Sequence, residues 1–120
     1  MLTIILDTDF LLDCLRWKID IKKELTRILD EPFILTVLSN TIKELTGKKD
    51  GKLAKAYIEK FCTTITTKNN DPFDYAIFDQ PKTWVATQDK QLKEKLKKEG
   101  FGIITIRQQH YLMIQHVLRS

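Results

Sequence analysis

The chain has 120 residues, of which 42% are hydrophobic and 30% charged, and its formal net charge is +4. This length is typical of one domain, so we expect a single domain over residues 1–120. No apolar run approaches the roughly 20 residues that a membrane-spanning helix needs, and the short apolar start lacks the basic flank of a signal peptide. We therefore expect a cytoplasmic protein. Its basic balance favours an anionic partner.

The first half of the chain predicts two buried strands and four helices. Leu2–Leu6 is a continuous apolar run, which predicts a strand buried on both faces and ending at Asp7. Residues 10–15 predict a short helix, and a second helix is expected to begin after Asp20 as its N-cap. Phe33–Leu38 predicts the second strand because it is rich in aromatic and branched side chains.

Residues 39–46 predict a short helix that Gly47 closes. The helix after the following basic loop is expected to pack through one apolar face, made of Leu53, Ala56, Tyr57 and Phe61. Residues 63–67 are mostly β-branched and predict a third strand. Cys14 and Cys62 lie far apart without a histidine cluster, so we expect reduced thiols and no zinc site.

The second half continues the alternation of helices and strands. In chain order it predicts a helical piece over 73–78, a strand over 83–87, a helix over 88–99, a strand over 101–106 and, in the tail 108–120, an amphipathic helix over 111–118. Strands that alternate with helices predict an α/β fold with helices on both faces of a largely parallel sheet. We therefore expect a three-layer α/β/α sandwich around a central, mainly parallel five-stranded sheet.

Four acidic residues fall where strands end and helices begin. Asp7 and Asp89 directly follow predicted strands, Glu44 follows one within two turns, and Asp74 opens a helix after a strand and a turn. Because these ends lie along one edge of a parallel sheet, we expect the four carboxylates to face one crevice. They would repel each other there, and a divalent cation would remove that repulsion. All-oxygen ligands select Mg²⁺ or Mn²⁺, which with a basic surface points to phosphodiester cleavage.

Each of these acids also has a purely structural explanation. Asp7 and Asp89 stand at helix starts, where a carboxylate caps the helix or favours its dipole. Glu44 follows Thr41 by three residues, which is the spacing of a capping box. Asp74 lies in a predicted first helical turn as well. Taken singly, the acids therefore leave both explanations open.

The same stretches resemble the PIN-domain ribonucleases, and within them the small archaeal proteins related to ribosomal-RNA-processing factors. The matching pieces are residues 5–12, 39–45, 74–77 and 85–92, and the likeness extends over nearly the whole chain. The resemblance implies metal-dependent cleavage of single-stranded RNA by water attacking a phosphodiester in line. It implies that Mg²⁺ or Mn²⁺ is held by four acids, namely Asp7, Glu44, Asp74 and Asp89. It also implies that Asp9 and Thr87 orient the first of these acids.

The chain departs from the family pattern at two places. Asp9 stands where the family commonly has asparagine, which adds a negative charge to the crevice. The segment between Asp74 and Asp89 is shorter than the family pattern and contains a proline. Asp71 and Asp79 therefore compete with Asp74 for the third position.

Lysines flank the second and fourth acids and are candidates for phosphate contacts that give affinity without sequence specificity: Lys48, Lys49, Lys52, Lys90 and Lys93. The alternative for each lysine is a solvated helix face. Trp84 lies within a predicted strand and is expected in the core. The partners that the resemblance implies are single-stranded RNA, with ribosomal RNA as one candidate, a second copy of the chain, and an antitoxin or assembly partner.

Three other functions are compatible with parts of the pattern. Asp7-Thr8-Asp9 after an apolar strand also resembles the nucleophile motif of haloacid-dehalogenase-type phosphatases, although Leu11 stands where that family has threonine or valine. The toxin ribonuclease of a toxin–antitoxin pair would use the same chemistry. A non-catalytic PIN scaffold would bind RNA or a ribosome-assembly partner without cutting.

Overall fold

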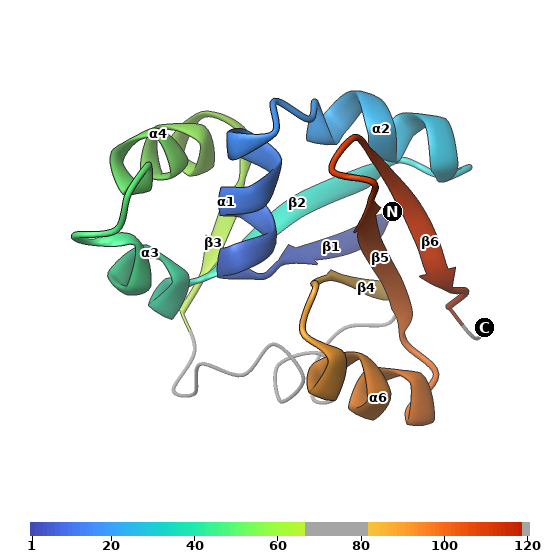
Figure 1. Ribbon diagram of the computed structural model, residues 1–120. Coiled ribbons are helices and arrows are strands. Elements are labelled where there is room, and N and C mark those ends of the chain that lie inside the picture. The colour runs from blue at the N-terminus through green and yellow to red at the C-terminus, as the bar shows by residue number, and fades with distance from the viewer. Residues whose placement is uncertain (67–81, 119–120) are drawn as a thin grey trace.

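Six strands form one sheet in the computed structural model, which describes residues 1–66 and 82–118. The strands are β1 (Leu2–Leu6), β2 (Phe33–Leu38), β3 (Thr63–Ile65), β4 (Thr83–Ala86), β5 (Gly102–Arg107) and β6 (Tyr111–His116). Their spatial order is β3-β2-β1-β4-β5-β6, and all neighbours are parallel except β5 and β6 (Figure 1). The α/β sandwich is confirmed, with one strand more than the expected five.

The described helices lie on both faces of this sheet. They are α1 (Thr8–Arg16), α2 (Ile21–Ile28), α3 (Ser39–Leu45), α4 (Gly51–Phe61) and α6 (Lys90–Lys98). Helices α1, α2 and α4 lie above the sheet in Figure 1 and α6 lies below it. The predicted N-cap of α2 is confirmed, because Oδ1 of Asp20 accepts a hydrogen bond from the Lys23 amide at 3.1 Å. None of the described helices is long and apolar enough to cross a membrane.

The two faces of the sheet are both buried, as the mostly apolar run at the chain start predicts. Ile4 and Leu6 point into the larger core under α1, α2 and α4, whereas Ile5, between them, joins Val85 in the core under α6. Successive side chains of a strand point to opposite faces, so a strand covered on both sides favours apolar residues on both faces. The ends of β1 and β4 lie side by side, because Leu6 pairs with Ala86.

The expected tail helix is wrong, because residues 111–116 form strand β6 antiparallel to β5. A short apolar run does not distinguish helix from strand by its periodicity alone. The turn that makes the hairpin contains Gln108 and Gln109, both with φ of 53°, and is closed by a hydrogen bond of 3.0 Å from the His110 amide to the Arg107 carbonyl. Positive φ in hairpin turns normally goes with Asn or Gly, and neither marks this turn.

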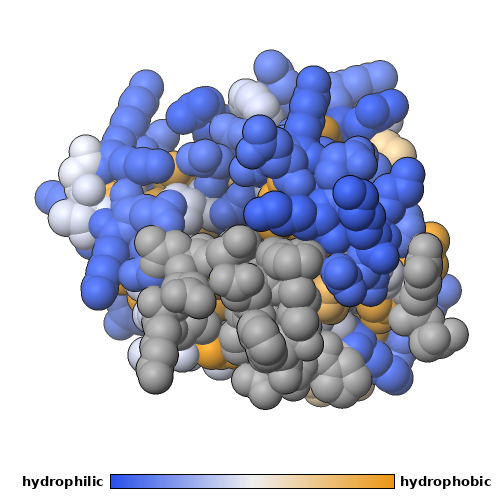
Figure 2. All heavy atoms as spheres, turned by 90° about the horizontal axis from the view of Figure 1, so that it is seen from below, coloured by the Kyte–Doolittle hydropathy of each residue, from blue (hydrophilic) through white to orange (hydrophobic). Residues whose placement is uncertain are grey.

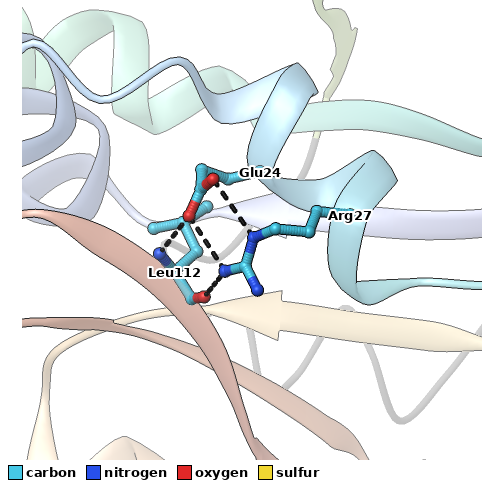
Figure 3. Close-up of polar contacts among 3 residues, drawn as sticks. All are labelled: Glu24, Arg27 and Leu112. Carbon is cyan, nitrogen blue, oxygen red and sulfur yellow. Dashed lines mark hydrogen bonds and ion pairs between the residues drawn. The ribbon is translucent and has the colours of Figure 1, made fainter.

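Helix α2 covers part of the outer edge of β6 through two side chains (Figure 3). Oε1 of Glu24 accepts a hydrogen bond of 3.0 Å from the Leu112 amide, and Arg27 donates one of 2.8 Å to the Leu112 carbonyl. Arg27 also donates to both carboxylate oxygens of Glu24, at 3.0 and 3.3 Å. The pair therefore satisfies the backbone groups that an edge strand otherwise leaves unpaired.

The apolar face expected for α4 is also wrong. Its buried residues are Gly51, Ala54 and Ile58, whereas Leu53 is 55% exposed and Phe61 is 38% exposed. A side chain at Gly51 would place its Cβ 2.1 Å from the Leu45 carbonyl oxygen, so the start of α4 packs directly on the end of α3. The buried face of α4 therefore includes Gly51, which the expected apolar face did not. Of the other residues expected there, Ala56 is exposed and Tyr57 is half-buried.

Trp84 is buried, as expected, and lies directly beside Gly102 on the neighbouring strand. A Cβ at Gly102 would approach Cδ2 of the Trp84 ring to 2.2 Å, so only glycine leaves room for the indole. Cys14 is buried and Cys62 half-buried, and both are free thiols. Burial raises the pKa of both thiols, that of Cys62 to about 11, which makes them poor nucleophiles.

Candidate active site

Asp7 is the centre of the candidate site and joins β1 to α1. Its Oδ1 accepts a hydrogen bond of 3.0 Å from the Thr8 amide, and its Oδ2 accepts one of 2.9 Å from the Thr87 hydroxyl. Thr87 is fully buried, and its hydroxyl oxygen accepts a further bond of 3.1 Å from the Asp89 amide. The Asp7 amide donates to the Ala86 carbonyl at 3.0 Å. Asp7 is thus fixed to the end of β4 by both backbone and side chain.

The surroundings of Asp7 oppose its negative charge. Burial raises the pKa of this carboxyl above its ordinary value of 3.8, and the nearby charges of Asp9 and Glu44 raise it further. The hydrogen bonds from Thr87 and Thr8 act in the opposite direction and lower the pKa. The net effect is a raised pKa, and burial of the carboxylate is its largest cause.

Asp89 begins α6 and is its N-cap. Its Oδ1 accepts hydrogen bonds from the amides of Gln91 and Leu92, at 2.9 and 3.1 Å. The expectation that Asp89 caps a helix is therefore confirmed. Both of these hydrogen bonds go to Oδ1 of the carboxylate.

An acidic pocket of about 490 Å³ lies between the starts of α1 and α6. We define this acidic pocket by its charged and amide side chains, which are Asp7, Asp9, Asp13, Arg16, Gln88 and Asp89. Two of these acids are partly compensated at the rim, because Asp9 lies 3.6 Å from the Lys48 ammonium and Asp13 lies 3.6 Å from the Arg16 guanidinium. Burial and the charge of Asp9 raise the pKa of Asp13 despite Arg16.

Glu44 lies near this pocket without lining it. It is exposed on α3, close enough to Asp7 for its charge to act on that carboxyl. A buried hydrogen bond of 3.1 Å from the Thr8 hydroxyl to the Thr41 hydroxyl joins the first turn of α1 to α3. The capping-box explanation of Glu44 is wrong, because the N-cap of α3 is Leu38 and no side chain caps this helix.

The predicted third acid, Asp74, and its competitors Asp71 and Asp79 lie outside the described residues. Within 1–66 and 82–118, no group of three or more Asp, Glu, His or Cys side chains is arranged to hold a metal ion. Four carboxylates meet in the acidic pocket, and carboxylate oxygens suit a hard cation such as Mg²⁺ or Mn²⁺. A cation here would also offset the repulsion that raises the pKa of Asp7.

The candidate RNA-binding lysines fall in different places. Lys90 and Lys93 line a second pocket of about 580 Å³ beside the acidic pocket, together with Arg107. Lys48 is the partner of Asp9, and Lys49 and Lys52 are exposed at the start of α4. Seen from the α6 side, hydrophilic side chains gather over this helix (Figure 2).

Sequence reasoning missed Asp13, Gln88 and Arg107 as pocket residues. Asp13 follows Asp9 by four residues, which places both on one face of a helix and is a usable signal. Gln88 and Arg107 had no comparable signal, since their proximity depends on the pairing of β4 with β5.

Comparison with known proteins identifies the family of this fold and site. Residues 4–109 match the family model described as a PIN like domain. The chain is 32% identical, over 129 aligned residues, to Ribonuclease VapC4 of Methanocaldococcus jannaschii, covering 95% of this chain and 97% of that relative. The solved structure of the PIN domain endonuclease Utp24 superposes with a TM-score of 0.80 at 20% identity, covering 98% of this chain and 96% of the other, so the two share a fold. These matches decide against the phosphatase alternative. The chain belongs to the PIN-like domain family.

Proposed function

We propose that this chain is a metal-dependent endoribonuclease that cleaves single-stranded RNA. The observation that carries the proposal is the half-buried Asp7 carboxylate, which Thr8 and Thr87 hold at the wall of a pocket that Asp9 and Asp89 share. The family membership and the likeness to Ribonuclease VapC4 support it.

The residues that would hold Mg²⁺ or Mn²⁺ are the four predicted acids, Asp7, Glu44, Asp74 and Asp89. When bound, such an ion activates water and stabilises charge on a phosphoryl oxygen. Thr87 fixes the Asp7 carboxylate in one orientation and so limits the reorganisation that binding requires. Asp9 adds negative charge at the rim, where Lys48 partly balances it.

The test is cleavage of a mixed-sequence single-stranded RNA in Mg²⁺, Mn²⁺ or EDTA by the wild type and by Asp7→Asn. Asp30→Asn is the matched control, because it removes the same charge from an exposed residue in the loop between α2 and β2. We expect cleavage with metal in the wild type and the control, and none in EDTA or in Asp7→Asn. RNA that is bound but uncut by all three proteins in every metal would replace the proposal with a non-catalytic scaffold.

The biological role that we propose is processing of ribosomal RNA in the cytoplasm, and the alternative is a toxin held by an antitoxin. The relative VapC4 is a ribonuclease, and a toxin would cleave RNA by the same chemistry. The toxin is therefore the alternative role. Incubation of the active protein with intact ribosomal RNA and with precursor RNA separates the two. Discrete cuts confined to the precursor support processing, whereas growth arrest on expression that a co-expressed small protein relieves would establish the toxin. Light scattering in the same preparations tests the expected homodimer.

A further inference from the structure

A cationic pocket lies directly beside the acidic one, and the two share a wall. We define the cationic pocket by Lys90, Lys93, Glu94, Thr105, Arg107 and the shared residue Gln88. It brings together three cations and one acid, whereas the acidic pocket has four acids and one cation. The surface therefore changes sign across a single side chain.

The cationic pocket is held in place by a chain of hydrogen bonds. Lys93 donates a hydrogen bond of 2.9 Å to the Thr105 hydroxyl, and this buried hydroxyl donates in turn to Oε1 of Gln88. The same Gln88 oxygen accepts from the Ile106 amide at 2.8 Å, and the Gln88 side-chain nitrogen donates to the Ile106 carbonyl at 3.4 Å. Lys93 and the shared wall are thus fixed to β5 before any ligand binds, which lowers the entropy cost of binding.

The charges of this pocket are incompletely balanced. Partial burial lowers the pKa of the Lys93 ammonium, and the positive charges of Arg107 and Lys90 lower it further. A phosphate is the ligand that best offsets such crowding, because lysine and arginine form strong charge-assisted hydrogen bonds with its oxygens.

We propose that the cationic pocket binds a backbone phosphate of the RNA strand, next to the phosphodiester that lies at the acidic pocket. This inference rests on the proposed ribonuclease function and adds a binding position to it. An RNA strand presents phosphates in succession, so one of them can lie against Arg107 and Lys93 while its neighbour lies across Gln88, near Asp7. Contacts of this kind position the strand without reading its sequence.

The test measures RNA affinity in a protein that does not cut. In an Asp7→Asn background, binding of a labelled single-stranded RNA is followed across salt concentrations for added Arg107→Gln, Lys93→Gln and Lys97→Gln. Lys97 is the matched control, because it is an exposed lysine of α6 that lines neither pocket. We expect Arg107→Gln and Lys93→Gln each to weaken binding by roughly tenfold, the factor that corresponds to about 1.4 kcal/mol. We also expect the slope of log affinity against log salt to fall by about 0.7, the value for one lost phosphate contact in a single strand.

The result that overturns the inference is equal RNA affinity in the Arg107, Lys93 and Lys97 variants while the wild type still cleaves RNA. If the wild type cleaves no RNA in any metal, but the Arg107 and Lys93 variants still bind RNA more weakly than the Lys97 variant, only the proposed catalysis is overturned. Titration of inorganic phosphate, followed by NMR of the Lys93 and Arg107 side chains, supplies the second arm. Saturation by free phosphate that leaves RNA binding unchanged would assign the pocket to a small anion and reject the RNA strand.

Discussion

The Thr87 hydroxyl donates a hydrogen bond of 2.9 Å to Oδ2 of Asp7, although 80 positions of sequence separate the two residues. The same hydroxyl oxygen accepts from the Asp89 amide at 3.1 Å. One buried side chain therefore sets both the orientation of the first acid and the course of the backbone at the last one.

Replacing Thr87 by valine should raise the pKa of Asp7 further, because the hydrogen bond from Thr87 lowers that pKa. It should also leave the Asp89 amide without its acceptor, at a cost of about 1–3 kcal/mol in the free energy of unfolding. We expect the pH profile of RNA cleavage to move to higher pH. Thr87→Ser keeps the hydroxyl and should retain the wild-type profile, and identical profiles for valine and serine would contradict this role.

The pKa of Asp7 also predicts how stability depends on pH without metal. Its folded pKa lies above 3.8, so the folded state binds this proton more tightly than the unfolded chain does. The stability from this group is fully present below the unfolded pKa and is lost as pH rises through the folded pKa. In EDTA, the free energy of unfolding of the wild type should therefore fall relative to Asp7→Asn as pH rises above 3.8, by about 1.4 kcal/mol per unit of pKa shift.

Bound metal should reverse the difference in the free energy of unfolding between the wild type and Asp7→Asn at neutral pH. Added Mg²⁺ or Mn²⁺ at about 100 times its dissociation constant should stabilise the wild type by about 2.7 kcal/mol and leave Asp7→Asn nearly unchanged. Thermal unfolding in EDTA and in each metal measures both effects. Equal stabilisation of the two proteins would show that the ion binds elsewhere.

Gly102→Ala should destabilise the sheet, because its Cβ would lie 2.2 Å from Cδ2 of Trp84. Overpacking of this kind costs about 1–3 kcal/mol, and a contact this short belongs at the upper end. Chemical denaturation of the single variants and of Gly102→Ala combined with Trp84→Leu provides the measurement. The cost of the alanine should shrink when the indole is absent, and an unchanged cost would place the strain in the backbone.

Glu24→Ala should expose the edge of β6 at Leu112. The carboxylate accepts the Leu112 amide, and its pKa is lowered chiefly by the hydrogen bond from Arg27. Hydrogen exchange of the Leu112 amide should accelerate roughly tenfold in the variant, which corresponds to about 1.4 kcal/mol of lost local stability. Below the folded pKa of Glu24, the exchange rates of the Leu112 amide in the wild type and the variant should become equal. Glu31→Ala removes a more exposed carboxylate, paired with Lys82 at 3.2 Å, and should leave Leu112 unaffected.

Much of this fold follows from local sequence pattern. β1 and β2 are mostly apolar runs with one threonine each, and Asp20 and Asp89 mark helix starts with their own side chains. The features that the local sequence pattern did not predict depend on contacts between residues that are distant in sequence. β6 takes its conformation from pairing with β5 and from a turn without Gly or Asn, and the start of α4 packs at Gly51 directly on Leu45.

The candidate site could also be predicted only in part from the sequence. The positions of Asp7 and Asp89 near strand ends could be predicted from the sequence, because Asp7 directly follows a mostly apolar run and Asp89 follows one by three residues. The shared wall at Gln88 could not, since its hydrogen bonds go to residues 17 and 18 positions away on a strand whose register the sequence does not reveal.

The short connection from Thr87 to Asp89 is hydrogen-bonded to β1 on one side and, through Gln88, to β5 on the other. Its geometry therefore depends on the three neighbouring strands β1, β4 and β5. The last of these along the chain, β5, ends at Arg107. During synthesis, the acidic pocket cannot take its final shape until the segment up to residue 107 has left the ribosomal exit tunnel. A nascent chain shorter than this carries the acids without the arrangement that joins them.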